Sequence, residues 1–179
     1  CAVRRLGADI VLTDDAEEIL GADKVIFPGV GHAATSMEYL RARGLDSLIA
    51  GLRQPVLGIC VGLQLMCRHS EEGDADCIGI FDVPVTKFHP EDPLLKVPQM
   101  GWNDISDLKS SLFDGVNDGV FVYYVHSYRA ALSPWTVATT DYGGRYSAAL
   151  HRDNFWATQF HPEKSGSVGE TILKNFLNL

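Results

Sequence analysis

The sequence has few basic residues, and they are not clustered. Its 179 residues include 15 Lys and Arg against 23 Asp and Glu, which gives a formal net charge of −8. Nucleic acids and anionic membranes are bound through concentrated positive charge, so neither is expected as a main partner. No apolar run approaches the length of a membrane span, and the beginning has no charged-then-apolar signal pattern. We therefore expect a cytoplasmic protein with no nucleic-acid or membrane partner.

The sequence also lacks cysteine spacings that are typical of metal sites. Of the four cysteines, Cys67 and Cys77 lie near His69, but no fourth ligand follows at a spacing that suits zinc. We expect these two cysteines to be core or half-buried packing residues, and a chain that needs a reduced thiol fits the cytosol. There is no phosphate-binding glycine signature. Neither a metal nor a cofactor is expected.

Strand and helix patterns alternate in the first part of the chain. Strand patterns lie at 8–12, 24–27 and 55–57, and helical patterns at 14–21, 36–52 and after residue 60. This alternation predicts an α/β fold with a mostly parallel central sheet flanked by helices. The capping box at 14–17 opens the first of these helices, which Gly21 would close.

Strand patterns dominate after Gly79. They lie at 81–88, 119–125 and 136–140 and predict additional antiparallel or mixed strands. A second capping box at 167–170 predicts a last helix with one apolar face. The chain is 46% hydrophobic and has no linker or repeat, so we expect a single domain over 1–179.

The pattern around Cys60 is the most informative part of the chain. An apolar strand enters a cysteine that stands between two glycines and continues into a helix, which is the pattern of a nucleophile elbow. Far downstream, His161 and Glu163 are two residues apart on an extended segment, so their side chains share a face. A lone cysteine is usually a core residue, but this combination predicts a catalytic triad of Cys60, His161 and Glu163.

A second glycine-rich turn precedes the elbow. Acyl transfer needs at least two N–H donors for the oxyanion of its tetrahedral intermediate. The N–H of Val61 and an N–H from Gly29, Val30 or Gly31 form the predicted pair. A simple loop between strand and helix explains the same glycines, so both interpretations are open at this point.

Five motifs carry a resemblance to a known family. They are Phe-Pro-Gly-Val-Gly at 27–31, Gly-Ile-Cys-Val-Gly-Leu-Gln at 58–64, Pro-Gln-Met-Gly-Trp-Asn at 98–103, Tyr-Tyr-Val-His-Ser-Tyr at 123–128 and Gln-Phe-His-Pro-Glu-Lys-Ser at 159–165. Through them the sequence resembles the class I, triad-type glutamine amidotransferases and, among these, the branch of histidine biosynthesis. The resemblance spans nearly the whole chain and implies a flavodoxin-like fold. Relative to the family, we expect the N-terminal strand to be lacking.

The resemblance implies hydrolysis of glutamine to glutamate and ammonia through a glutamyl thioester on Cys60. It further implies that Gln64, His126, Ser127 and Tyr128 hold the substrate glutamine. For Gln64 the alternative is an ordinary solvent-facing helix residue. For His126 the alternative is a core or hairpin histidine whose side chain does no chemistry.

The resemblance also implies a protein partner. In the family, ammonia passes to a separate cyclase subunit of (β/α)₈-barrel fold, with which the glutaminase forms a heterodimer. The residues implied at the partner interface are Gln99, Met100, Trp102, Asn103, Tyr123 and Lys164. The alternative is that the two aromatic residues belong to the core and that the lysine is simply solvated.

Two other functions remain open from the sequence. A γ-glutamyl-type cysteine hydrolase would use the same triad on a peptide-like substrate, but it gives no role to the motif at 99–103. A non-catalytic stress or partner-binding protein of the same fold would use its thiol only as a sensor. The spacing of His161 and Glu163 counts against this second alternative.

Overall fold

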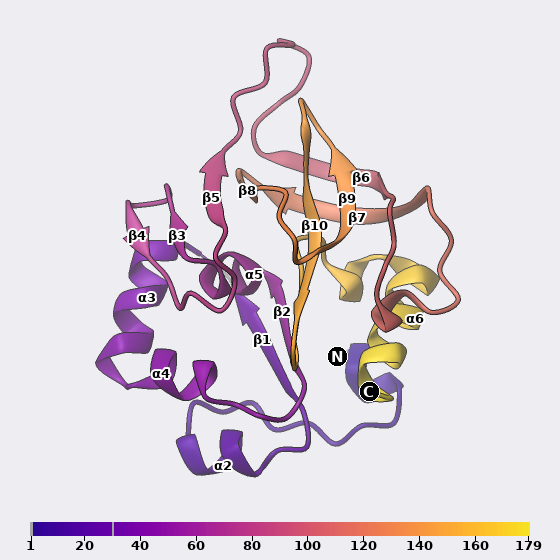
Figure 1. Ribbon diagram of the computed structural model, residues 1–179. Coiled ribbons are helices and arrows are strands. Elements are labelled where there is room, and N and C mark those ends of the chain that lie inside the picture. Colours follow the sequence, from indigo (N-terminus) through magenta and orange to yellow (C-terminus); the bar gives the residue numbers. More distant parts are fainter. Residues whose placement is uncertain (1, 30) are drawn as a thin grey trace.

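The computed structural model describes residues 2–29 and 31–179 (Figure 1). Its centre is a five-stranded sheet with the spatial order β1-β2-β11-β10-β9. These strands are β1 (Val25–Gly29), β2 (Val56–Cys60), β9 (Thr136–Asp141), β10 (Arg145–Arg152) and β11 (Phe155–Thr158). Strands β1, β2 and β11 are parallel, and β10 is antiparallel to both of its neighbours. The predicted α/β fold, with a parallel sheet extended by antiparallel strands, is confirmed.

Strand β2 lies in the middle of the parallel part of the sheet. All five of its residues are buried, as expected for a parallel strand that is covered on both faces. Val56 pairs with Val25 of β1 on one side and with Phe155 of β11 on the other. The strand ends at Cys60, so the thiol lies at the carboxyl end of a parallel strand. Ligand sites of open α/β sheets lie at this end.

Helices cover both faces of the central sheet (Figure 1). The helices are α1 (Ala2–Arg5), α2 (Ala16–Gly21), α3 (Ala33–Ala42), α4 (Leu45–Ala50), α5 (Val61–Met66) and α6 (Gly166–Leu177). Residues of α3, α4 and α5 belong to one apolar core, and residues of α1 and α6 to another. Within residues 2–29 and 31–179, no helix combines the length and the apolar character needed to cross a bilayer.

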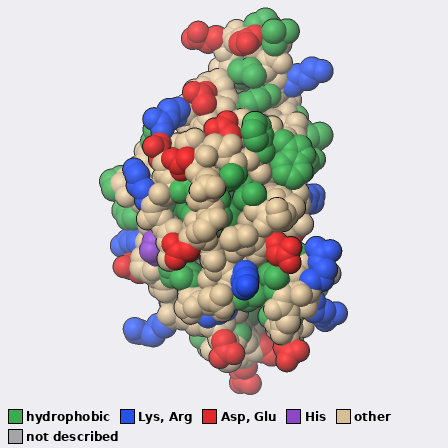
Figure 2. Space-filling view, turned by 90° about the vertical axis from the view of Figure 1, so that its right-hand side faces the viewer, with side chains coloured by type: hydrophobic (Ala, Val, Ile, Leu, Met, Phe, Trp, Pro, Cys, Tyr) green, Lys and Arg blue, Asp and Glu red, His purple; other side chains and the backbone are tan. Residues whose placement is uncertain are grey.

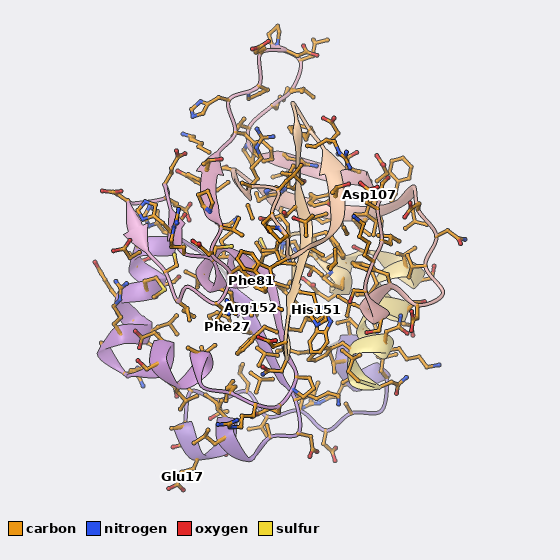
Figure 3. The ribbon with its side chains drawn as sticks, viewed as in Figure 1. Glu17, Phe27, Phe81, Asp107, His151 and Arg152 are labelled. Carbon is orange, nitrogen blue, oxygen red and sulfur yellow. The ribbon has the colours of Figure 1, made fainter. Side chains whose placement is uncertain are left out.

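Two neighbouring residues of β10 show how the sheet separates these cores. His151 and Arg152 extend to opposite sides of the strand (Figure 3). His151 stacks on Trp156, with ring centroids 4.4 Å apart, on the side of α6. Arg152 donates a hydrogen bond to the carbonyl of Ile80 on the other side, next to the fully buried Phe81. Because side chains alternate along β10, this strand contributes side chains to both apolar cores.

Two smaller sheets complete the fold. The first has the order β4-β3-β5-β8 and consists of β3 (His69–Ser70), β4 (Ala75–Asp76), β5 (Pro84–Lys87) and β8 (Tyr128–Ala130). The second pairs β6 (Gln99–Ile105) with β7 (Val120–His126) in antiparallel register. Two 3₁₀ turns, η1 (Ser111–Phe113) and η2 (Pro162–Lys164), flank this second sheet and α6. The β6–β7 pair lies at the upper right in Figure 1, beyond β9 and β10.

Two local predictions are wrong in detail, at segment 8–12 and at the start of the last helix. The segment 8–12 forms no strand, and Val11 and Leu12 are 69% and 95% exposed. Segment 8–12 pairs with no described strand, and β1, whose one described partner is β2, is the edge strand of the sheet. The helical stretches predicted between 36 and 52 are confirmed as α3 and α4, which are separated at Gly44, with a φ of 67°.

The second error concerns the start of α6. The helix begins at Gly166, before the predicted capping box, and Ser165 has no side-chain capping bond. The Ser165 hydroxyl instead donates to the carbonyl of His161 and accepts the N–H of Tyr123. The predicted apolar face is confirmed, because Ile172 and Phe176 are buried.

Glycines allow β1, β2 and α5 to approach one another closely. A Cβ added to Gly62 would overlap the carbonyl oxygen of Phe27, and one added to Gly29 would overlap the backbone of Val61 and Gly62. A Cβ on Gly58 would press on the Met66 side chain. The elbow therefore depends on the absence of side chains at these positions.

This packing predicts that Gly62→Ala destabilises the chain. We expect the free energy of unfolding to fall by about 3 kcal/mol or more, because the backbone of β1 must move away from the new methyl group. Urea unfolding would measure the loss. Gly51→Ala is the matched control, since its Cβ would lie 3.5 Å from the carbonyl oxygen of Ser47, an ordinary contact. Equal stability of the two variants would contradict the close approach.

Candidate active site

Cys60 has a backbone conformation that is unusual for a residue with a side chain. Its φ of 56° and ψ of −112° lie outside the helical and strand regions, and α5 begins at the next residue. Such strain persists only where the surrounding structure imposes it, and a sharp strand-to-helix turn at a nucleophile is a known case. The Sγ atom of Cys60 lies 3.8 Å from the carbonyl oxygen of Val125 and 3.8 Å from Nε2 of Gln159.

His161 and Glu163 are paired as predicted. Nδ1 of His161 lies 2.8 Å from Oε1 of Glu163. The backbone N–H of His161 donates to the carbonyl of Tyr123 on β7, which fixes the histidine segment on the neighbouring strand. Nε2 of His161 is buried and has no hydrogen-bond partner in the described part of the chain. The nitrogen that a triad uses for proton transfer is therefore left unoccupied.

The protonation of this pair suits a triad. Burial disfavours the charged form of His161, but its interactions with Cys60 and with Glu163 outweigh burial and raise the pKa to about 9. Burial also acts to raise the pKa of Glu163, yet the hydrogen bond with His161 holds it below its usual value. At neutral pH the histidine is therefore protonated and the glutamate ionised. Strand β7 brings the two groups together, because Sγ of Cys60 faces the carbonyl of Val125 and the N–H of His161 bonds the carbonyl of Tyr123.

The residues predicted for the oxyanion lie around the elbow. Gly29 is the last residue of β1, pairs with Cys60 and packs against Val61, the first residue of α5. Gly31 has a φ of 88°, which favours glycine. Val30 lies outside the described residues. The oxyanion role of this group stays a prediction.

Glu72 is a residue of this region that sequence reasoning missed. Its Oε2 atom accepts the N–H of Ala33 at 2.8 Å, at the start of α3 and directly after the glycine-rich turn. The carboxylate thereby ties the segment after β3 to the end of that turn. No local pattern marks Glu72, because it lies in an ordinary acidic stretch and its partner is 39 residues away.

The residues predicted for substrate binding lie on α5 and where β7 passes into β8. Gln64 is only 2% exposed and donates to the carbonyl of Tyr128 and to Oε1 of Gln159, so the solvent-facing alternative is wrong. His126 is buried, its Nδ1 lies 2.7 Å from the same carbonyl, and burial lowers its pKa to about 4. Ser127 connects β7 and β8, and its carbonyl accepts the N–H of Phe88. Their binding of glutamine stays a prediction.

Most residues predicted for the partner interface form one exposed surface. Met100 and Trp102 on β6 are 65% and 55% exposed, so the core alternative is wrong for the tryptophan. The ring of Tyr123 on β7 lies edge-on to Trp102, with centroids 6.0 Å apart, and Nζ of Lys164 lies 5.8 Å from the tyrosine centroid. Phe121, which sequence reasoning missed, is 57% exposed on the same strand. We call these five residues the β6–β7 surface.

Figure 2 shows hydrophobic side chains gathered in the upper part of the face that Figure 1 has on its right. Exposed apolar groups of this density usually mark a binding surface.

Two residues predicted at the interface behave differently. Gln99 is 2% exposed and its Oε1 accepts from the Tyr146 hydroxyl, so its side chain is not part of the β6–β7 surface. The alternation along β6 explains this, because Gln99 faces inward where Met100 faces outward. Asn103 is half-buried, and its amide donates to the carbonyl of Asp141.

The pKa of His161 gives a direct test of the pair. Replacing Glu163 by Gln removes the carboxylate that favours the imidazolium, so the histidine pKa should fall clearly below about 9. Titration of the imidazole resonances by NMR would measure it, with Glu170→Gln on the exposed side of α6 as the control. An unchanged titration in Glu163→Gln would contradict the pairing.

The same pKa determines a stability effect. Because the folded value of about 9 exceeds the ordinary value of 6.5, His161 stabilises the fold fully below pH 6.5. That contribution is lost as the pH rises through about 9.

Comparisons with known proteins agree with this geometry. Residues 2–179 match the family described as Glutamine amidotransferase class-I. Imidazole glycerol phosphate synthase subunit HisH of Bacteroides thetaiotaomicron is 58% identical over 178 residues, which cover 99% of this chain and 91% of that protein. The same subunit of Escherichia coli O157:H7 is 44% identical, with coverage of 99% and 91%. A crystal structure of a glutamine amidotransferase shares the fold, with a TM-score of 0.73 over 99% of this chain and 89% of that chain at 16% identity.

The chain therefore belongs to the class I glutamine amidotransferases. Within this class it is similar to the HisH subunits of imidazole glycerol phosphate synthase, which match it over nearly its full length.

Proposed function

We propose that this chain is the glutaminase subunit of an imidazole glycerol phosphate synthase. It forms one amidotransferase domain over residues 1–179, hydrolyses glutamine to glutamate and ammonia, and supplies the ammonia to a cyclase subunit in histidine biosynthesis. The observation that carries the proposal is the strained Cys60 beside the paired His161 and Glu163. The high identity to HisH subunits supports the choice of reaction.

The three triad residues divide the reaction between them. His161 holds the proton of the Cys60 thiol, and the thiolate sulfur attacks the side-chain amide carbon of glutamine to form a tetrahedral intermediate. His161, protonated at neutral pH, gives its proton to the departing nitrogen, which leaves as ammonia when the C–N bond breaks. Glu163 holds the imidazole in place throughout. Water, with His161 now acting as the base, hydrolyses the glutamyl thioester to glutamate, and the Cys60 sulfur leaves as the thiolate beside the reprotonated His161.

Backbone groups at the elbow stabilise the oxyanion. The N–H of Val61 follows the nucleophile directly, and the turn at Gly29–Gly31 supplies the second donor. Gly29 packs against Val61, which supports this pairing of donors.

The contacts of Gln64 limit what it offers to the substrate. Both N–H groups of its amide already donate, one to the Tyr128 carbonyl and one to Gln159. Only the carbonyl oxygen of Gln64 is left, so it accepts a hydrogen bond from the substrate glutamine. The backbone around His126, Ser127 and Tyr128 provides the remaining substrate contacts.

The partner is a cyclase of (β/α)₈-barrel fold, and it binds the β6–β7 surface. This surface is close to the chemistry, because the carbonyl of Tyr123 accepts the N–H of His161 and the carbonyl of Val125 faces the thiol of Cys60. An apolar centre with a cation at its rim is typical of protein interfaces. Docking here covers the active site and keeps ammonia from solvent.

Cys60→Ala separates the two half-reactions. We expect glutamine-dependent synthesis to fall by roughly 10⁵-fold or more, because no other group forms the thioester. Synthesis from added ammonium salts by the complex of both subunits should continue. Steady-state assays with the two nitrogen sources would measure both rates, and Cys77→Ala, whose thiol donates to the Ala75 carbonyl, is the control.

Two outcomes would count against this proposal. Loss of both activities in Cys60→Ala would contradict the division of labour between the subunits. Efficient hydrolysis of γ-glutamyl peptides without any partner would favour the γ-glutamyl hydrolase instead.

Trp102→Ala should weaken binding of the cyclase. Removing a large exposed aromatic side chain from the centre of the β6–β7 surface is expected to raise the Kd by about 30-fold. Isothermal titration calorimetry would measure it, together with thermal unfolding to show that the chain remains folded. Leu20→Ala is the control, since Leu20 is 59% exposed but lies on α2, at the opposite end of the molecule from β6 (Figure 1). Equal affinity of the two variants would mean that the surface is misassigned.

A further inference from the structure

Buried polar side chains form a continuous chain of contacts from strand β6 to the catalytic thiol. We call it the polar network. In order from β6 its members are Gln99, Tyr146, His126, Gln64 and Gln159. Polar groups inside an apolar core are costly unless they are hydrogen-bonded, so the position of each member depends on its neighbours in the network.

The end of the network at the thiol is formed by two glutamines. Nε2 of Gln159 lies 3.8 Å from Sγ of Cys60, and Oε1 of Gln159 accepts from Nε2 of Gln64 at 3.0 Å. Gln64 also donates to the Tyr128 carbonyl at 2.9 Å. Gln159 is fully buried and Gln64 is 2% exposed, so neither has water as an alternative partner. The direction of these bonds leaves the amide N–H of Gln159 as a donor toward the sulfur.

The middle of the network is a neutral histidine. A carbonyl oxygen only accepts, so Nδ1 of His126 must donate to the Tyr128 carbonyl at 2.7 Å. Nε2 of His126 is then an acceptor, and it lies 3.3 Å from the hydroxyl of Tyr146. The same hydroxyl donates to Oε1 of Gln99 at 2.8 Å. The Tyr128 carbonyl thus joins the two halves of the network.

The end at β6 is not fully satisfied. Tyr146 has one hydroxyl proton but two acceptors, and Nε2 of Gln99 is buried without a partner among residues 2–29 and 31–179. Rotating the Gln99 amide by half a turn would let its N–H donate to the Tyr146 oxygen. The Tyr146 proton would then be free for His126. The network therefore has two arrangements, which differ in the orientation of Gln99.

Gln99 lies directly beside the β6–β7 surface, so a movement of that surface also moves Gln99. It is the first residue of β6 and pairs with His126 of β7 in the strand register. The next residue, Met100, faces outward and belongs to the β6–β7 surface. A small shift of β6 therefore moves Gln99 relative to Tyr146.

We propose that the polar network is a positioning device for the nucleophile: Gln159 orients the sulfur of Cys60, and Gln99 and Tyr146 set the orientation of Gln159 through His126 and Gln64. Contacts on the outer face of β6 then alter the setting of the thiol. This last step rests on the proposed partner, whereas the positioning itself is a property of the chain alone.

Alkylation of Cys60 tests the positioning without any assay of function. The full chain is treated with iodoacetamide, and mass spectrometry of the Cys60 peptide gives the rate. We expect Gln159→Leu to slow alkylation by about tenfold, because the sulfur loses its only side-chain N–H donor in the described contacts. Tyr146→Phe should slow it about threefold, since it acts through intermediate residues.

Tyr142→Phe is the matched control. It also removes a tyrosine hydroxyl from the β9–β10 hairpin region, but that hydroxyl bonds the Lys96 carbonyl and lies outside the polar network. The control should react at the wild-type rate. A double variant of Tyr146→Phe and Gln159→Leu should react no more slowly than Gln159→Leu alone, because both changes act on one chain of contacts.

Several results would overturn the proposal. They are wild-type alkylation rates in both Tyr146→Phe and Gln159→Leu, equal slowing in the Tyr142→Phe control, and independent, multiplying effects in the double variant. Should Gln159→Leu fail to fold, Gln99→Leu replaces it, with an expected slowing of about threefold.

A kinetic measurement separates this proposal from the proposed function. In the complex with the cyclase, Tyr146→Phe should lower kcat for glutamine about threefold, since the thiol is displaced. Absence of glutaminase activity in the wild-type complex would refute the proposed function. The alkylation rates would still test whether the polar network positions the sulfur of Cys60.

Discussion

The close approach of α5 to β1 and β2 is the constraint on which the rest of the site depends. Because Gly29 and Gly62 have no side chains, the start of α5 lies directly on the end of β1. The chain must then turn within one residue, and Cys60 takes a positive φ that it would not adopt alone. The strain is maintained by the buried strand β2 and by the core around α5. The thiol is thereby held at the carboxyl end of β2, where Cys60 is 5% exposed and borders the core on the side of α6.

The second half of the triad depends on the β6–β7 pair. The carbonyl of Tyr123 accepts the N–H of His161, and its N–H donates to the Ser165 hydroxyl, which in turn donates to the His161 carbonyl. Strand β7 therefore fixes the segment that carries the histidine, while its outer face is exposed. One strand thus connects the chemistry with the surface on which we expect the partner.

Prediction from the sequence was most successful where the decisive pattern is local. The βαβ alternation, the elbow at Cys60 and the two-residue spacing of His161 and Glu163 are readable because neighbouring residues determine them. The strand predicted at 8–12 was wrong because an apolar run becomes a strand only when it pairs with another, and segment 8–12 pairs with none of the described strands. The start of α6 was wrong because the Ser165 hydroxyl bonds to the turn before it instead of capping the helix.

The sequence by itself determined the reacting groups: a thiol between glycines and a paired imidazole and carboxylate, whose short spacing needs no tertiary contact. The tertiary structure decided how these groups are supported. Gln159 meets Cys60 across 99 positions, and Glu72 meets Ala33 across 39. Whether Gln99 faces the core or the partner depended on which face of β6 packs inward. Such contacts form between residues distant in sequence, so only the packing of the whole chain specifies them.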